Sequence, residues 1–348
     1  MLNLSLQNVV VIIFSAFVVV AVTTPLAKNI AIHFDVLDRP IQKHKTHREP
    51  IPYFGGLAIV VGVCFVSIVG LILTKKPSNS YYLLGALLIP AIIMSIVGLI
   101  DDIKHLSPLP RFFAQNIVGV FIVFILVRSG TIGSPSGIPL LDIVVSMIWI
   151  VGLTNALNFF DNVDGGAAGT AAISSFGIVV LAQQSDQVLI SAFSLVVLGG
   201  MLGFLAWNKP PARIYMGDAG SLFLGTVLAS LTIRIDPTPI NKGASLLIPL
   251  LLLAMPVLDT SVAVLSRLQR GASPFLGGKD HLSHRLLELG LSKRFAVILL
   301  WSLQLFYVGL AICISYAPYH YEGIISVISV IFFALTFIYF LKLPYPLK

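Results

Sequence analysis

The chain has 348 residues and a net charge of +7, and 57% of its residues are hydrophobic while only 11% are charged. Soluble domains carry about 25% charged residues, so this composition excludes an ordinary water-soluble protein and is typical of a chain with many membrane-spanning helices. The basic residues form no basic domain with interleaved aromatic side chains, so we expect no nucleic-acid partner.

Apolar stretches of roughly 20 residues recur along the whole chain, and each is long enough to cross a bilayer as a helix. The first has no basic segment before it, so we interpret it as a retained helix and not as a signal peptide. The sequence predicts one all-α polytopic membrane domain over residues 1–348, a bundle of about 11 (10–11) transmembrane helices. The predicted spans are residues 8–27, 53–73, 81–100, 112–128, 139–157, 168–183, 188–207, 219–234, 244–267, 293–316 and 322–342.

Charged residues are divided unequally between the two sides of this predicted bundle. With eleven spans, the loops after odd-numbered spans share one side with the C-terminus, and 17 of the 22 Lys and Arg residues fall there. The positive-inside rule assigns that side to the cytoplasm. Ten of the 15 Asp and Glu residues also fall there, although the rule does not favour carboxylates. A site for a divalent metal and a phosphate would explain the excess, so we expect a cytoplasmic active site on a multi-pass protein of the plasma (inner) membrane.

Four polar clusters lie at the predicted cytoplasmic ends of the spans, and the first follows the third span. It contains Asp101, Asp102 and Lys104. Adjacent helical residues point about 100° apart, so the two carboxylates can converge on one substrate only if the helix ends here. Pro108 and Pro110 favour such an end. The alternative interpretation is a solvated cytoplasmic turn.

The second cluster ends the fifth span, where a polar side chain recurs at every third position: Asn155, Asn158, Asp161 and Asp164. On a helix or a 3₁₀ turn, successive members of this series are near neighbours. Amide and carboxylate oxygens are the ligands that Mg²⁺ prefers, and the two glycines that follow allow the backbone to approach a ligand closely. The alternative is a junction between helices that is rich in capping residues.

The third cluster is the Met-Gly-Asp segment at the start of the eighth span, with Asp218 as its acid and Arg213 close before it. Asp218 lies where a helix N-cap or a first-turn acid would lie, so helix capping is one interpretation. The flanking glycines and Arg213 favour the other, a role in binding a metal or a phosphate.

The fourth cluster contains His281 and His284, which lie three residues apart and therefore on one face if they are helical. They stand beside Lys279 and Arg285 and have no third soft ligand near them, so a diphosphate contact fits them better than a zinc site. A basic loop next to the membrane is the alternative.

The ninth span contains Asp259, three residues after Pro256, and the proline predicts a kink in this span. An acid inside a membrane is a functional candidate. Structural hydrogen bonding is the interpretation that we prefer for Asp259.

Together these residues resemble the polyprenyl-phosphate N-acetylhexosamine-1-phosphate transferase family (glycosyltransferase family 4), and most closely its undecaprenyl-phosphate GlcNAc-1-phosphate branch. The resemblance covers nearly the whole chain. The matching residues are Asp101 and Asp102, those from Asn155 to Gly165, those from Met216 to Ser221, those from His281 to His284, and Lys45, His47, Pro50, Pro52, Gly55 and Gly56. The chain departs from the usual pattern of the family at His105, Asn162, Gly166 and Ser283, and it has no histidine triplet, which favours UDP-GlcNAc over a pentapeptide nucleotide.

The resemblance implies transfer of N-acetylglucosamine-1-phosphate from UDP-GlcNAc to undecaprenyl (polyprenyl) phosphate in the membrane lipid, with release of UMP. The product would start the synthesis of a cell-envelope polysaccharide, in cell wall biogenesis or in lipopolysaccharide or teichoic acid synthesis. Phospho-MurNAc-pentapeptide transfer, transfer from another UDP-amino sugar and a covalent two-step mechanism stay open, as does a homodimer. A secondary transporter is the alternative of a different class, and it predicts polar sites near the bilayer midplane in paired halves.

The resemblance also implies the roles of single residues. Asp218 and Asn158 would bind Mg²⁺, with Mn²⁺ as an alternative. Asp101 would orient or deprotonate the lipid phosphate with support from Asp102, and Asp161 joins them as a catalytic residue. The substrate-binding residues would be Lys45, His47, Lys104, Asn155, Asp164, Arg213, His281, His284 and Arg285.

Overall fold

The computed structural model describes residues 4–39, 50–74, 78–128, 138–236, 242–274 and 278–345. Within these ranges the chain forms thirteen helices and one short antiparallel pair of strands, in which Leu37 pairs with Pro52 and Asp38 with Ile51. The elements are α1 (Leu6–His33), β1 (Leu37–Asp38), β2 (Ile51–Pro52), α2 (Gly55–Leu73), α3 (Ser78–Lys104), α4 (Pro108–Arg128), α5 (Pro139–Phe160), α6 (Gly166–Gln184), α7 (Val188–Asn208), α8 (Gly217–Arg234), α9 (Lys242–Leu252), α10 (Ala254–Gln269), α11 (Leu282–Glu288), α12 (Lys293–Tyr316) and α13 (Tyr319–Lys342).

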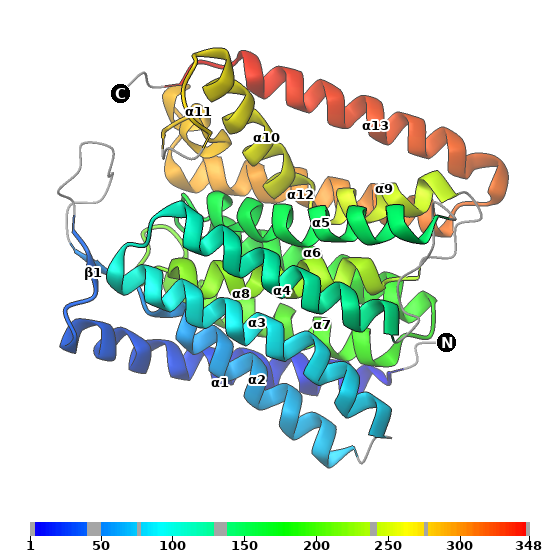
Figure 1. The fold of residues 1–348 in the computed structure, drawn as a ribbon, viewed down its shortest axis with the longest axis horizontal. Coiled ribbons are helices and arrows are strands. Elements are labelled where there is room, and N and C mark those ends of the chain that lie inside the picture. The colour runs from blue at the N-terminus through cyan, green and yellow to red at the C-terminus, as the bar shows by residue number, and fades with distance from the viewer. Residues whose placement is uncertain are drawn as a thin grey trace.

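The long helices lie side by side in one bundle, with α1 and α2 along one edge and α13 along the opposite edge (Figure 1). The two ends of the chain lie at opposite ends of this bundle (Figure 1). In the described part of the chain, nine helices are long and apolar enough to span a membrane: α1 to α7, α12 and α13. The predicted all-α polytopic fold is therefore confirmed.

Helix α8 corresponds to the predicted eighth span but does not belong to those nine helices. It packs against α2, α3, α5, α6, α7 and α9, and nearly all of its side chains are buried. A helix that is enclosed by other helices does not need a lipid-facing apolar surface, so Ser, Thr and Gly can replace larger apolar residues in it. With α9 and α10 counted as one span the structure gives ten candidates, and the count of eleven stays a prediction.

The predicted ninth span is broken into α9 and α10, whose axes differ in direction by 83°. The break at Leu253 lies one turn before Pro256, because a proline has no N–H for the carbonyl four residues earlier, which here is that of Leu252. The buried amide of Gln304 on α12 repairs the gap. Its Nε2 donates to the Leu252 oxygen at 2.8 Å, and its Oε1 accepts from the Met255 N–H at 3.0 Å.

We expect Gln304→Leu to lower the free energy of unfolding by about 2–4 kcal/mol, because it leaves a buried backbone N–H and a buried C=O without partners. Thermal unfolding of the purified protein in detergent measures the effect. Ser302→Ala is the matched control, since the Ser302 hydroxyl is exposed and bonds only within its own helix. Equal melting temperatures for the two variants would contradict this prediction.

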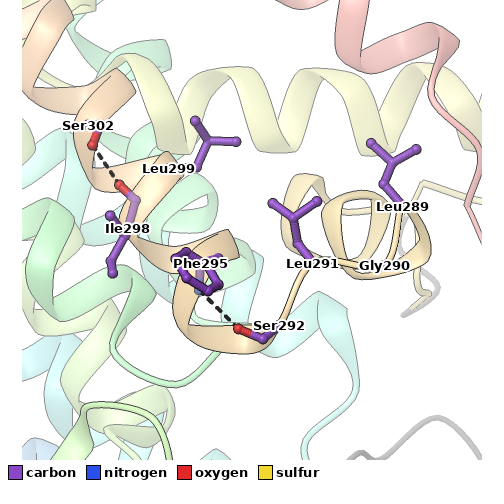
Figure 2. A pocket seen from close by; sticks show the side chains of 8 residues that line it. All are labelled: Leu289, Gly290, Leu291, Ser292, Phe295, Ile298, Leu299 and Ser302. Atoms are coloured by element: carbon purple, nitrogen blue, oxygen red, sulfur yellow. Dashed lines mark hydrogen bonds between the residues drawn. The ribbon is translucent and has the colours of Figure 1, made fainter.

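A shallow pocket of about 560 Å³ lies at the elbow between α11 and α12 (Figure 2). No charged residue lines it, and its large side chains continue the exposed apolar surface of α12, so it suits lipid and not a nucleotide or a metal ion. The lining residues are Leu289, Gly290, Leu291, Ser292, Phe295, Ile298, Leu299 and Ser302.

Candidate active site

The four polar clusters of the sequence meet at one end of the bundle. Hydrogen bonds and ion pairs join the end of α3, the start of α4, the end of α5 and the start of α8. A second set joins the end of α5 to α10 and α11. Helices that are far apart in the sequence therefore supply one continuous polar surface.

Two carboxylates share a single guanidinium at the centre of this surface. Arg111 Nη1 donates to Asp101 Oδ2 at 2.5 Å and to Asp218 Oδ2 at 2.7 Å, and we name these three residues the acid–arginine centre. The other oxygen of Asp218 accepts from Asn158 Nδ2 at 2.7 Å, and the same amide group donates to Ser221 Oγ at 2.9 Å. One positive charge for two acids leaves a net negative charge here, which favours the binding of a further cation.

Asp102 caps helix α8 from a different helix. Its Oδ1 accepts from the N–H of Asp218 at 2.8 Å and its Oδ2 from the N–H of Ala219 at 3.0 Å. Both groups belong to the first turn of α8, whose N–H groups have no partner within the helix and favour a negative charge. Asp218 is therefore not the N-cap of α8, and its carboxylate is left to face the acid–arginine centre.

Glycines at two positions allow this close approach of α3 and α8. A Cβ on Gly98 would overlap the backbone of Asp218, so α3 can lie against the start of α8 only without a side chain there. Gly217 has a positive φ of 71°, and a Cβ on it would lie 2.7 Å from a carboxylate oxygen of Asp102. Both the backbone conformation and the space therefore require glycine at residue 217.

We expect Asp102→Asn to lower the free energy of unfolding by about 0.5–2 kcal/mol, because an amide offers one oxygen where two N–H groups need acceptors. Transfer activity should also fall, since the first turn of α8 carries Asp218. Melting temperature and UMP release measure the two effects. Asp236→Asn is the control, because it makes the same chemical change at an exposed residue beyond the far end of α8, and it should alter neither the melting temperature nor UMP release. Equal losses in the two variants would refute the capping role of Asp102.

Asp161 ends helix α5, and within the described ranges its carboxylate forms no hydrogen bond or ion pair. Burial, followed by the charges of Asp218 and Asp164, raises the pKa of Asp161 to about 7. Near neutral pH this carboxyl group can therefore either hold a proton or accept one. Tyr53 and Tyr215 lie on the same surface with ring centroids 6.1 Å apart, and burial and nearby carboxylates raise the pKa of both hydroxyls.

Asp164 fixes the loop that follows α5. Its Oδ2 accepts from the N–H of Ala212 at 3.2 Å and lies 3.6 Å from Lys293 Nζ at the start of α12. The Asp164 carboxylate thereby joins this loop to the α7–α8 loop and to α12.

The histidine segment, residues 280–288, is held by Asp259. Its Oδ2 accepts from His281 Nδ1 at 2.7 Å and its Oδ1 from the N–H of Leu282 at 2.7 Å. His281 Nε2 lies 3.2 Å from Arg267 Nη2, so protein groups occupy both ring nitrogens of this buried histidine. Asp259 therefore lies beside the site and not at an isolated depth in the bilayer, and the structural interpretation of its hydrogen bonds agrees with these contacts.

His284 differs from His281. Its ring is half-buried and has no hydrogen-bond partner among the described residues. Burial, and then the neighbouring His281, lowers the pKa of His284 to about 4, so its imidazole is neutral at neutral pH. Asp280 is anchored instead: burial opposes its ionisation, but the hydrogen bonds and charge of Arg267 outweigh this and lower its pKa.

Comparisons with known proteins agree with this arrangement. A family model described as glycosyl transferase family 4 matches residues 83–236, which run from α3 to the end of α8. A probable undecaprenyl-phosphate N-acetylglucosaminyl 1-phosphate transferase of Bacillus subtilis (strain 168) is 32% identical over 95% of this chain and 92% of its own length. The chain belongs to glycosyl transferase family 4. The family predicted from the sequence is confirmed.

Two further relatives of this glycosyl transferase family 4 chain differ in the substrate that their names give. A decaprenyl-phosphate N-acetylglucosaminephosphotransferase of Mycolicibacterium smegmatis is 33% identical over 85% of this chain and 79% of its own length. A phospho-N-acetylmuramoyl-pentapeptide-transferase of Streptococcus pneumoniae (strain Taiwan19F-14) is 28% identical over 56% and 62%. The two relatives whose names give N-acetylglucosamine therefore align over more of this chain than the relative whose name gives N-acetylmuramoyl-pentapeptide.

In the structure of this family 4 member, some predicted site residues have other partners or are exposed. Asn155 pairs with the amide of Gln115 on α4, at 2.6 and 3.1 Å. Lys104 is exposed at the end of α3, and exposed Arg213 lies 6.0 Å from the ring centroid of Trp207. The predicted residues Lys45 and His47 lie outside the described residues.

Arg285 has a structural role and stabilises the fold. Its side chain is fully buried, and Nη1 donates to the carbonyls of Phe340, Leu341 and Leu343 at the end of α13. Its other donors reach the Asp280 oxygen and Ser266 Oγ. Because protein oxygens surround the guanidinium, we do not retain Arg285 among the proposed substrate-binding residues.

Sequence reasoning did not identify Arg111 as a site residue and used it only to assign topology. Its position, ten residues after Asp101 and directly after Pro110, was a usable signal, because a loop that short keeps a base close to the acids. Tyr53 and Tyr215 were missed as well, since a lone ring next to a motif has no distinctive spacing. Ser221 was named as part of the Met-Gly-Asp segment but was given no role.

Proposed function

We propose that this chain transfers N-acetylglucosamine-1-phosphate from UDP-GlcNAc to undecaprenyl or another polyprenyl phosphate, releases UMP and makes a lipid-linked sugar for cell-envelope polysaccharide synthesis. The acid–arginine centre carries the proposal. Two carboxylates that share one guanidinium at the end of a membrane bundle suit the binding of a metal–diphosphate substrate. The names of the two relatives that align over most of the chain support the choice of donor and acceptor.

The proposed metal ion is Mg²⁺, with Mn²⁺ as an alternative, and Asp218 and Asn158 would hold it. The donor set fits, because carboxylate and amide oxygens are hard ligands, and Asn158 Oδ1 accepts no hydrogen bond in the described part of the chain while Nδ2 holds Asp218. No group of three or more His, Cys, Asp or Glu is arranged for a metal among the described residues, so water and substrate oxygens would complete the coordination. The bound ion would neutralise charge on the diphosphate.

In the proposed reaction an oxygen of the lipid phosphate bonds to the β-phosphorus of UDP-GlcNAc, and the bond from that phosphorus to the oxygen of UMP breaks. A phosphate monoester is largely ionised near pH 7, so the enzyme needs little basic strength. Asp161 accepts the remaining proton, for which its pKa of about 7 is suitable. Asp101 and Arg111 orient the phosphate, since phosphoryl transfer depends mainly on alignment and charge.

The donor would lie between the acid–arginine centre and the histidine segment. His284 offers an imidazole N–H that no described residue uses, and Asp164 and Lys293 mark the edge of the surface on the α12 side. The excess of Lys and Arg in loops at this end supports a cytoplasmic site on the plasma (inner) membrane.

UMP release tests the proposal. Purified protein receives undecaprenyl phosphate and Mg²⁺ with either UDP-GlcNAc or UDP-MurNAc-pentapeptide, and chelation by EDTA is the metal control. Release from UDP-GlcNAc alone, lost with EDTA, is the expected result. Release from the pentapeptide nucleotide alone would keep the reaction and overturn the donor. No release from either, by protein that keeps its melting transition, would refute the transferase assignment.

A further inference from the structure

Three buried or half-buried side chains join the end of α5 to α10 and α11, and we name Asn162, Asp259 and Ser283 the positioning link. Ser283 Oγ donates to Asn162 Oδ1 at 2.5 Å. Asn162 Nδ2 donates to the Phe159 carbonyl at 2.7 Å and to Asp259 Oδ2 at 3.4 Å. The amide of Asn162, just after α5, therefore contacts the end of α5 as well as α10 and α11.

The positioning link lies mostly in the interior of the protein. Asp259 is 0% exposed and Ser283 is 1% exposed, so neither side chain has water as an alternative partner. Asp259 also accepts from the N–H of Leu282, the first residue of α11, and thereby caps that helix from α10. Hydrogen bonds that are shielded from water fix geometry more firmly than exposed ones, because breaking them leaves polar atoms unsatisfied.

Two residues of the positioning link are sequence neighbours of the two side chains of the site that have no described partner. Asn162 follows Asp161, the carboxyl group without a described partner, and Ser283 precedes His284, the histidine without one. The contact between Asn162 and Ser283 therefore sets where His284 stands relative to Asp161.

We propose that Asn162, Asp259 and Ser283 are positioning residues that hold His284, as a contact for the diphosphate of the nucleotide-sugar donor, in register with Asp161, the proposed proton acceptor. The inference rests on the proposed function and deepens it by assigning donor binding to this edge of the site. None of the three residues needs to touch the substrate. Breaking the link should weaken binding of the donor and leave binding of the lipid phosphate, which faces the acid–arginine centre, unchanged. The value of kcat should also fall, because Asp161 is the proposed proton acceptor.

A double-mutant cycle of Ser283→Ala, Asn162→Ala and the two together tests the link. Each single change should raise KM for UDP-GlcNAc, and Kd measured by calorimetry, by roughly three- to tenfold, since both remove the Ser283–Asn162 hydrogen bond. Asn162→Ala should have the larger effect, because it also removes the bonds to Phe159 and Asp259. KM for undecaprenyl phosphate should stay constant. The double variant should lose little more than Asn162→Ala alone, because residues in direct contact act non-additively. Asn162→Asp should be worse than Asn162→Ala, because it places a second carboxylate against Asp259.

Ser315→Ala is the matched control. Ser315 Oγ donates to Gln184 Oε1 at 2.5 Å, so it is also a buried hydroxyl that bonds an amide on another helix, but α12 carries it to the far end of the bundle. This variant should keep wild-type KM values whatever happens to its melting temperature. Equal effects of Ser283→Ala and Ser315→Ala, additive effects in the cycle, or a rise confined to the acceptor KM would overturn the positioning role. A wild-type protein that neither binds nor consumes UDP-GlcNAc would overturn the proposed function itself.

Discussion

Asp218→Asn is expected to abolish transfer in a protein that still folds. The substitution removes the charge of the proposed metal ligand and the acceptor for Arg111, so kcat should fall by about 10³-fold or more, as for the loss of other groups that stabilise charge in a transition state. Folding should survive because α8 is capped through backbone N–H groups by Asp102, and not by the side chain of Asp218.

UMP release and the melting temperature separate these two outcomes. Ser221→Ala is a useful control, because it removes a neighbouring partner of Asn158 but leaves every carboxylate in place, and we expect a loss of less than about tenfold. Wild-type turnover by a folded Asp218→Asn variant would remove Asp218 from the metal site.

Arg111→Gln is expected to reduce kcat/KM by about 10²–10³-fold. Without the guanidinium, Asp101 and Asp218 face each other with no shared cation, and the lipid phosphate loses its proposed positive partner. Arg111→Lys retains the charge, but its single ammonium group cannot reproduce the planar guanidinium, so we expect partial activity between those of Gln and Arg.

Steady-state kinetics with both substrates check this prediction, and Arg294→Gln provides the control. Arg294 is exposed at the start of α12, and among the described residues it bonds only the Pro210 carbonyl, at 3.3 Å. Its loss therefore removes one positive charge from the same end of the bundle without changing the acid–arginine centre. If the two variants lose the same activity, net charge and not the position of Arg111 explains the effect.

The positions of the helices, and the end of the bundle at which the site residues lie, could be predicted from the sequence, because they depend on composition and on the order of the spans. Apolar length gave most of the helices within about four residues, but α1 continues to His33 where the predicted span ends at residue 27, and the predicted ninth span is two helices. Parity placed Asp101, Asn158, Asp218 and His284 at one end, where the structure has them. Contacts between side chains could not be predicted, because they depend on how helices cross. The capping of α8 by Asp102 is an example, since capping residues are normally sought next to the helix that they cap.

The bend between α9 and α10 shows a second limit on what can be predicted from the sequence. Pro256 predicted a kink, and the bend does occur one turn before it. The size of the bend could not be read from the proline, because the freed carbonyl is satisfied by Gln304 nearly fifty residues later. Asn162 and Ser283 likewise stand in separate motifs, and no spacing pattern joins them.

The buried guanidinium of Arg285 has a consequence for the order of assembly in the membrane. Three of its acceptors are carbonyls at the end of α13, a helix that is synthesised after every other helix of the site. Until α13 has inserted, Arg285 lacks these acceptors, and an unpaired buried charge is strongly destabilising. The histidine segment therefore gains its full set of contacts only when α13 is in place.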